Sequence, residues 1–211
     1  MLAVAAFVVA VQAPMWSQIS HSAQGQTDKK ANQLIEKAAA KVANARFTVT
    51  MSAYDGEHKL LSTQKADVAL SGSRYNLTAA DQQVICDGKT VWHWNKTAKE
   101  VTVTDMPTDD FNLFNPSAML AGHERNFRAK YIRTEDDGTA VVDLQPRSAR
   151  TFHKLRLFIE EKSGKLKRAE VHKYDSSREV YDFGKQSYGR QSGPFAFDSK
   201  AHPEVEVIDM R

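Results

Sequence analysis

Cysteine is almost absent from this sequence of 211 residues. The single cysteine, Cys86, excludes an intramolecular disulfide. It lies in an apolar run with no His or Lys beside it, so a buried, unreactive thiol is expected rather than a reactive one. The chain is long enough for one full-sized domain with a sizeable core.

A strong charge of one sign is also missing. Lys and Arg number 29 and Asp and Glu number 26, which gives a net charge of +3. The two signs are interspersed, and no basic stripe alternates with aromatic residues. Nucleic acid is therefore not expected as a partner.

No apolar run is long enough to span a bilayer, which takes about 20 residues. Residues 2–11 are almost all Ala, Val, Leu and Phe, and they match the apolar part of a secretory signal peptide. We expect residues 1–23 to be removed after Ala23, with Ala13 as a weaker cleavage point, and residues 24–211 to form a single exported domain. Since no Lys or Arg precedes the run, one interpretation places the natural start upstream of Met1. The alternative is a buried N-terminal helix.

Catalytic motifs are missing as well. The chain has no G-x-S-x-G, H-E-x-x-H, P-loop or G-x-G-x-x-G pattern. Its seven histidines are scattered singly, so neither a metal site nor a cofactor is expected, although residues distant in sequence can meet in space. The paired acids at 109–110 and 136–137 are expected in solvated loops. These features favour a binding protein over an enzyme.

What the sequence does contain is a β-rich centre at residues 84–104. Asp87-Gly88 separates two of its three β-forming runs, and this pair is typical of a tight hairpin in which both turn residues have positive φ. In the middle run Trp92 and Trp94 share one face, while Val91 and His93 share the other. A large apolar surface results, and either the protein's own core or a ligand must cover it.

Around this centre the hydrophobic period changes along the chain. Residues 28–45 predict an amphipathic helix whose apolar face includes Leu34 and Ile35. Period-2 strands are then expected at residues 47–51, 60–65, 66–70, 75–78, 127–133, 140–144, 152–160, 166–173, 178–183 and 205–207. The predicted fold is mainly β, an incomplete, curled antiparallel barrel with helices covering its concave face.

A segment at residues 106–123 interrupts the strands. Residues 116–121 can form a short helix, with Asn115 as its cap and Gly122 at its end. This connection is unusually apolar, and we expect it to lie over or inside a groove. Its large apolar residues are Phe111, Leu113, Phe114, Met119 and Leu120.

Several motifs resemble a known family. The run DGKTVW at 87–92, followed by a polar turn and EVTV at 100–103, resembles the central motif of the LolA-type periplasmic lipoprotein carriers. NPSAML at 115–120 and HPEVEVIDMR at 202–211 resemble the insert and C-terminus of the branch found in Bacteroidetes. The resemblance covers essentially the whole mature chain.

The resemblance implies a non-catalytic periplasmic carrier and a monomer. It would take acylated lipoproteins from an inner-membrane ABC transporter, shield their acyl chains in an apolar groove and deliver them to the outer membrane, with or without a dedicated acceptor there. The candidate groove residues are Phe47, Val49, Met51, Tyr75, Leu77, Trp92, Trp94, Val101 and Val103. The candidate lid residues are Leu34, Ile35, Phe114, Met119 and Leu120.

Arg74 is the candidate for a role in cargo handover. Proteobacterial members have a basic residue and then Pro before the corresponding strand, whereas this chain reads SGSRY at 71–75. The alternative for Arg74 is an exposed residue at the edge of a strand. Two other functions remain open: a LolA-like protein that senses lipoproteins or binds another lipid, and an enzyme or structural module on the same sheet. A polar groove with clustered His and acidic residues would favour the last.

Overall fold

The computed structural model describes residues 16–106 and 115–211. Its helices are α1 (Trp16–Val42), α2 (Pro116–Ala121) and α3 (His123–Asn126). Its strands are β1 (Asn44–Tyr54), β2 (Leu60–Ser71), β3 (Arg74–Ala79), β4 (Gln82–Cys86), β5 (Thr90–Asn95), β6 (Glu100–Asp105), β7 (Phe127–Thr134), β8 (Thr139–Pro146), β9 (Phe152–Glu160), β10 (Leu166–Lys173), β11 (Arg178–Tyr188) and β12 (Glu206–Asp209).

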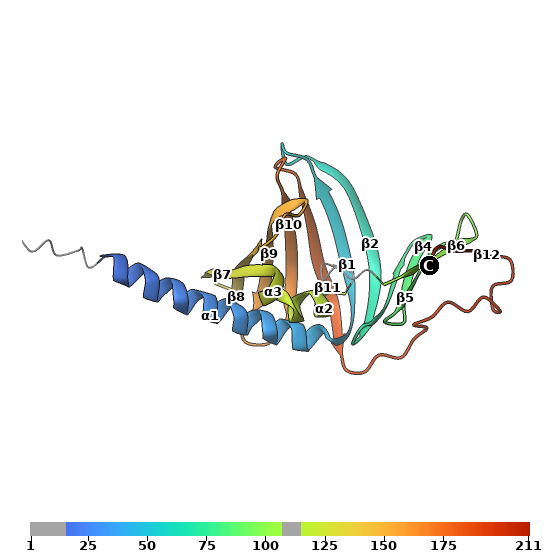
Figure 1. Ribbon diagram of the computed structural model, residues 1–211, viewed down its shortest axis with the longest axis horizontal. Helices are drawn as coiled ribbons and strands as arrows, with labels where there is room; N and C mark the ends of the chain where they lie inside the picture. Colours follow the sequence, from blue (N-terminus) through green and yellow to red (C-terminus); the bar gives the residue numbers. More distant parts are fainter. Residues whose placement is uncertain (1–15, 107–114) are drawn as a thin grey trace, which may run out of the picture.

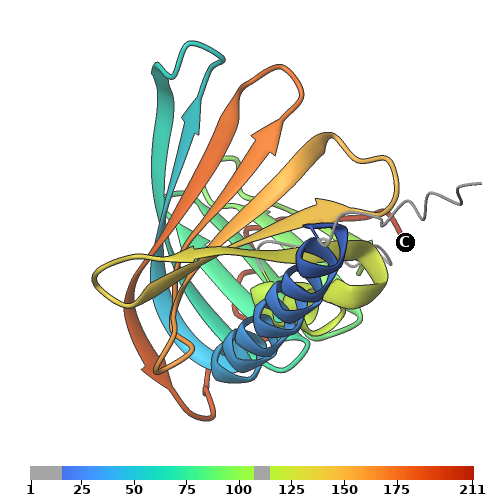
Figure 2. The same cartoon turned by 90° about the vertical axis from the view of Figure 1, so that its left-hand side faces the viewer.

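The described strands form one sheet in the order β12-β6-β5-β4-β3-β2-β1-β11-β10-β9-β8-β7. Neighbouring strands are antiparallel, except that β12 lies parallel to β6. The sheet is strongly curled and its edge strands β7 and β12 lie far apart, with α1 on its concave side (Figures 1 and 2). The predicted fold class, an open, curled antiparallel sheet with few helices, is confirmed.

Helix α1 differs from the predicted helix at both ends. It includes residues 16–27, so it begins well before residue 28, and it ends at Val42 rather than at Ala45. Ala45 already belongs to β1, where buried and exposed residues alternate from the start of the strand. The β-forming alternation that begins after Val42 therefore overrides the helical spacing that includes Ala45. The predicted signal peptide lies mostly outside the described residues and stays a prediction.

The Asp87-Gly88 hairpin is confirmed, but its turn differs from the expected one. Of the connecting residues 87–89, only Gly88 has a positive φ, at 98°. The Asp87 carboxylate oxygen Oδ1 accepts hydrogen bonds from the backbone N–H groups of Lys89 and Thr90, both at 2.8 Å. An Asx-type turn thus stabilises the connection in place of a second positive φ.

The sheet has two faces, which we define by their neighbours. The inner face is the concave side, on which Ile35 of α1 packs against strand residues such as Leu157. Because paired residues share a face, the register from Leu157 through Ala169 and Tyr181 to Met51 carries the inner face across β9, β10, β11 and β1. The other, convex side is the outer face.

Two apolar clusters occupy the inner face. One joins α1 and α2 to β7–β10, and the other lies on β1–β5. Tyr181 and Phe183 of β11 pack against both clusters. The two clusters therefore form one continuous apolar surface on the inner face, half of which is occupied by helices.

Candidate functional site

The half of the inner face formed by β1–β5 is the candidate binding surface. Phe47 and Leu77 are only 3% and 4% exposed, and the Phe47 ring meets the Phe183 ring edge-on at 5.4 Å. The structure brings together on this half the predicted groove residues Phe47, Val49, Met51, Tyr75 and Leu77. Sequence analysis missed other members of the surface, namely Val68, Leu70, Val84, Val91, Tyr181 and Phe183.

The missed residues on β11 had a visible signal. Residues 178–183 were predicted as a strand, and its alternation puts Tyr181 and Phe183 on one face. Only the pairing of β11 with β1, which the sequence does not reveal, shows that this face is the inner one.

The other four predicted groove residues lie on the opposite face, so this part of the prediction is wrong: Trp92, Trp94, Val101 and Val103. Leu77 of β3 pairs with Val84 of β4, which pairs with His93 of β5. His93 is therefore on the inner face, and the residues on either side of it point to the outer face. The two valines of β6 pair with the tryptophans and share their side.

The two tryptophans belong to a separate small core on the outer face, and the sequence pattern alone did not distinguish this core from a binding groove. The C-terminal segment crosses the outer face, where the Trp94 ring lies 5.3 Å from the Phe197 ring and 4.6 Å from that of His202. Beneath this segment Val101 is fully buried. A segment more than 90 residues away in the chain therefore supplies the cover that the sequence pattern left open.

The lid candidates of α1 and α2 are buried on the inner face. Leu34, Ile35, Met119 and Leu120 are at most 5% exposed, in the cluster formed with β7–β10. Helix α2 begins and ends where the sequence predicts, and the Asn115 side-chain amide donates a hydrogen bond to the Gly72 carbonyl oxygen at 3.3 Å. Phe114 lies outside the described residues. The role of these helices as a lid stays a prediction.

Arg74 is half-buried rather than exposed at an edge. Its Nη2 donates to Ser71 Oγ at 3.2 Å, and its guanidinium group lies 4.9 Å from the centre of the Phe195 ring. These contacts fix the C-terminal segment to the start of β3. Arg74 thus has a packing role, and its role in handover stays a prediction.

A polar cluster interrupts the inner face near the tips of β10 and β11. Lys173 Nζ donates to Glu179 Oε1 at 2.6 Å, and the Tyr181 hydroxyl donates to Glu179 Oε2 at 2.8 Å. Burial opposes the charge on Glu179, but these two hydrogen bonds outweigh it, and the pKa of the carboxyl lies below its usual range. Burial, helped by Glu179, raises the pKa of Tyr181. A cavity of about 160 Å³ adjoins the cluster, lined by Met51, Ser52, Ala53, Ser62, Gln64, Glu179 and Tyr181.

A larger cavity, of about 750 Å³, lies beside α1, α3 and β7. Its walls include the charged side chains of Asp28, Glu124, Arg128 and Arg147. Burying acyl methylenes against such groups would remove water from charges without pairing them, which costs free energy. An apolar ligand is therefore better accommodated on the inner face of β1–β5.

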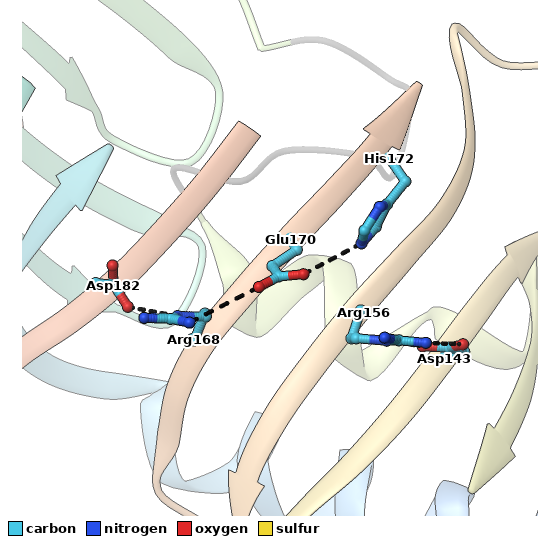
Figure 3. A network of polar contacts seen from close by, with 6 residues as sticks. All are labelled: Asp143, Arg156, Arg168, Glu170, His172 and Asp182. Atoms are coloured by element: carbon cyan, nitrogen blue, oxygen red, sulfur yellow. Dashed lines mark hydrogen bonds and ion pairs between the residues drawn. The ribbon is translucent and has the colours of Figure 1, made fainter. Parts of the chain in front are cut away.

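The outer face of β8–β11 carries an ionic network instead of an apolar surface (Figure 3). Arg156 donates twice to Asp143, at 2.7 and 2.9 Å, and Arg168 Nε donates to Asp182 at 2.6 Å. Glu170 pairs with His172 at 3.2 Å. Each charge has an opposite partner, as expected for a face held by ion pairs.

The remaining chemical candidates lie apart from one another. Cys86 is fully buried, as expected, and burial raises the pKa of its thiol. Asp137 lies in an exposed turn, where Lys167 Nζ binds it at 2.8 Å, whereas residues 109–110 lie outside the described chain. Within residues 16–106 and 115–211, no group of three His, Cys, Asp or Glu side chains could hold a metal ion.

None of the helices in these same residues is long and apolar enough to cross a membrane.

Comparison with protein families identifies the chain. The family model described as outer membrane lipoprotein carrier protein LolA matches residues 73–198, more than half of the sequence. The chain belongs to the LolA family. The matched region runs from the start of β3 through the insert to the C-terminal segment.

Solved structures resemble this chain at low sequence identity. An uncharacterised conserved protein from Thermus thermophilus is 7% identical, with a TM-score of 0.56 over 85% of this chain and 98% of that one. A LolA superfamily protein from Nitrosomonas europaea is 12% identical (TM-score 0.44; 81% and 98% covered), and LprF from Mycobacterium bovis is 11% identical (TM-score 0.46; 80% and 98% covered). Comparison with curated proteins gave no match.

The LolA assignment confirms the resemblance seen in the sequence and points to lipoprotein or lipid binding. LolA-family proteins are periplasmic. The Bacteroidetes-like branch stays a prediction.

Proposed function

We propose that this LolA-family chain is a periplasmic carrier that binds the acyl chains of lipoproteins on the inner face of β1–β5. One observation carries the proposal: the two clusters on the inner face form a continuous apolar surface, with Tyr181 and Phe183 joining its helix-covered half to its other half. An acyl chain gains about 0.8 kcal/mol for each methylene that it buries. Ten buried methylenes would supply about 8 kcal/mol.

Release of the cargo requires that something compete for the same surface. The side chains of this half are already buried, so an acyl chain reaches them only by displacing what covers them. Helices α1 and α2 pack on the neighbouring half of the same face. A shift of these helices would open the surface for loading, and their return would favour release.

The same proposal includes the partners. The carrier would receive lipoproteins from an inner-membrane ABC transporter and deliver them to the outer membrane or to an acceptor there. Residues 1–23 would direct export and be removed. The family assignment supports these steps, and none requires a catalytic residue.

The direct test is native mass spectrometry of the mature protein purified from a lipoprotein-producing host, together with displacement of a fluorescent acyl glycerol. The proposal expects a co-purified acylated species and displacement at micromolar lipid. Bound free lipid without any lipoprotein would instead favour a lipid-binding or sensing protein. A clean mass with no lipid binding would contradict the acyl-binding site itself.

A pair of neighbouring substitutions locates the site. Met51 points to the inner face and is partly buried, whereas Thr50 points to the outer face between Lys65 of β2 and Asp182 of β11. Met51→Glu would place a carboxylate against the acyl chain, and we expect lipid affinity to fall at least about tenfold, since a charge buried without a partner costs more than about 1.4 kcal/mol. Thr50→Glu should leave affinity unchanged. Equal affinities in both variants would contradict the assignment of the face.

A further inference from the structure

The position of the polar cluster on the inner face suggests a second contact with the cargo. Glu179 and Tyr181 are inner-face residues, because they pair with Ala53 and Met51 of β1. They lie near the strand tips that extend away from α1, where β10 ends and β11 begins (Figure 1). Further along β11, Phe183 continues the same face into the apolar surface. A chain buried along that surface would thus leave its polar head beside the cluster.

The cluster keeps hydrogen-bonding capacity for such a head. Lys173 uses one of its three N–H groups on Glu179, so two remain as donors. Each Glu179 oxygen accepts one of the hydrogen bonds described above and has a further lone pair. Ester carbonyl oxygens would match the free donors, and an amide N–H or a hydroxyl would match the free acceptor sites.

The charge of the cluster limits which heads it accepts. The charges of the Lys173 ammonium group and the Glu179 carboxylate sum to zero. Tyr181 is neutral, as tyrosine ordinarily is, and burial raises its pKa further. The nearest further cation along the strand, Arg178, pairs with Tyr54 and lies over its ring at 4.8 Å on the outer face. No surplus positive charge therefore faces the cavity from β11, and moving a phosphate or carboxylate out of water into a site of zero net charge costs free energy.

We propose that Lys173, Glu179 and Tyr181, with the cavity beside Met51, Ser62 and Gln64, form a head-group subsite for uncharged glyceryl ester or amide heads. This inference rests on the proposed function, since it assumes that acyl chains occupy the inner face. The subsite would select acylated molecules with neutral heads against anionic phospholipids of the same chain length. It would thereby keep the abundant membrane phospholipids from competing with the cargo.

Glu179→Gln tests the subsite, because the amide keeps the shape of the side chain and removes its negative charge. Monopalmitoylglycerol and palmitoyl lysophosphatidylglycerol would each displace a fluorescent acyl glycerol from the full mature chain. We expect the ratio of neutral to anionic affinity to fall about fivefold in the variant, the effect of one unit charge at a half-exposed position. Asp182→Asn is the matched control, since it removes a carboxylate from the outer face of the same strand, and its ratio should equal that of the wild type.

The outcomes separate the two proposals. A fall of the ratio in Glu179→Gln alone supports the subsite. An unchanged ratio, or an equal fall in Asp182→Asn, while the wild type binds both lipids, overturns the subsite and leaves the carrier function standing. Failure of the wild type to bind either lipid overturns both.

Discussion

At the scale of single residues, the outer face shows how ion pairs can stabilise a face of a sheet that no helix covers. Asp143 is 9% exposed, and its neighbours along β8, Val141, Val142 and Leu144, are all buried. Its carboxylate receives both hydrogen bonds of the Arg156 guanidinium group. The aliphatic part of such an arginine can cover apolar surface while its charged end remains paired.

Asp143→Ala should therefore destabilise the protein by about 2 kcal/mol, because it leaves a partly buried guanidinium group without its charged acceptor. Urea unfolding of the purified variant measures this. Glu135→Ala is the control, since its pair with Arg133 is exposed and should contribute little. Equal destabilisation by the two substitutions would show that burial of the Asp143 pair is unimportant.

Glu170 gives the outer face a dependence on pH. The hydrogen bond from His172 lowers the pKa of this buried carboxyl more than burial raises it, and Arg168 adds to the effect. Because this pKa is lower in the folded protein than in the unfolded chain, the ionised carboxylate stabilises the folded protein. The stabilisation is fully present at pH values above the pKa of the unfolded chain, about 4.3 for Glu. That contribution is lost as the pH falls through the folded value.

We thus expect the difference in unfolding free energy between the wild type and Glu170→Gln to shrink as the pH falls below about 4.3. Urea unfolding at a series of pH values measures it. A difference that stays constant or grows below about pH 4.3 would mean that Glu170 is not stabilised as an anion.

At the scale of elements, the turn between β9 and β10 is tied to α1. Lys37 Nζ of α1 donates to the backbone oxygens of Glu161 and Lys162. Gly164 in the same turn has φ +74°, and a Cβ added there would lie 2.7 Å from Lys37 Cγ. Both a backbone conformation and a close approach therefore require glycine at this position.

Gly164→Ala should cost more stability than Gly138→Ala. Gly138 also has a positive φ, +77°, but a Cβ added there would have nothing within 4 Å. The shared conformational strain is about 1–2 kcal/mol, and the contact with α1 should add about 1 kcal/mol in Gly164→Ala alone. Thermal or urea unfolding of both variants checks this. Equal losses would show that α1 does not press on the turn.

Local sequence signals predicted where helices, strands and turns lie better than they predicted what each of them packs against. Turn residues such as Asp87-Gly88 and the helix 116–121 were found because their chemistry acts within a few residues. The end of α1 was misjudged because Ala45 fits both a helical face and a buried strand position. The face of Trp92 was misjudged because its cover, including Phe197, comes from a distant segment.

At the scale of the whole molecule, the fold places two apolar surfaces on opposite sides of one sheet. The outer one, around Trp94, is closed by the protein's own C-terminal segment. The inner one is shared between the helices and the strands on which we place the cargo. The sequence predicted the curled sheet from its succession of strands, but which side was the inner one depended on the pairing of β1 with β11.

The central claim is that acyl chains bind on the inner face. Photo-crosslinking with a palmitoyl glycerol that carries a diazirine in its chain, followed by peptide mapping, tests it most directly. The account predicts adducts on inner-face residues such as Phe47, Leu77 and Phe183. Adducts concentrated on Trp94 and Phe197 would instead place the ligand on the outer face and contradict the account.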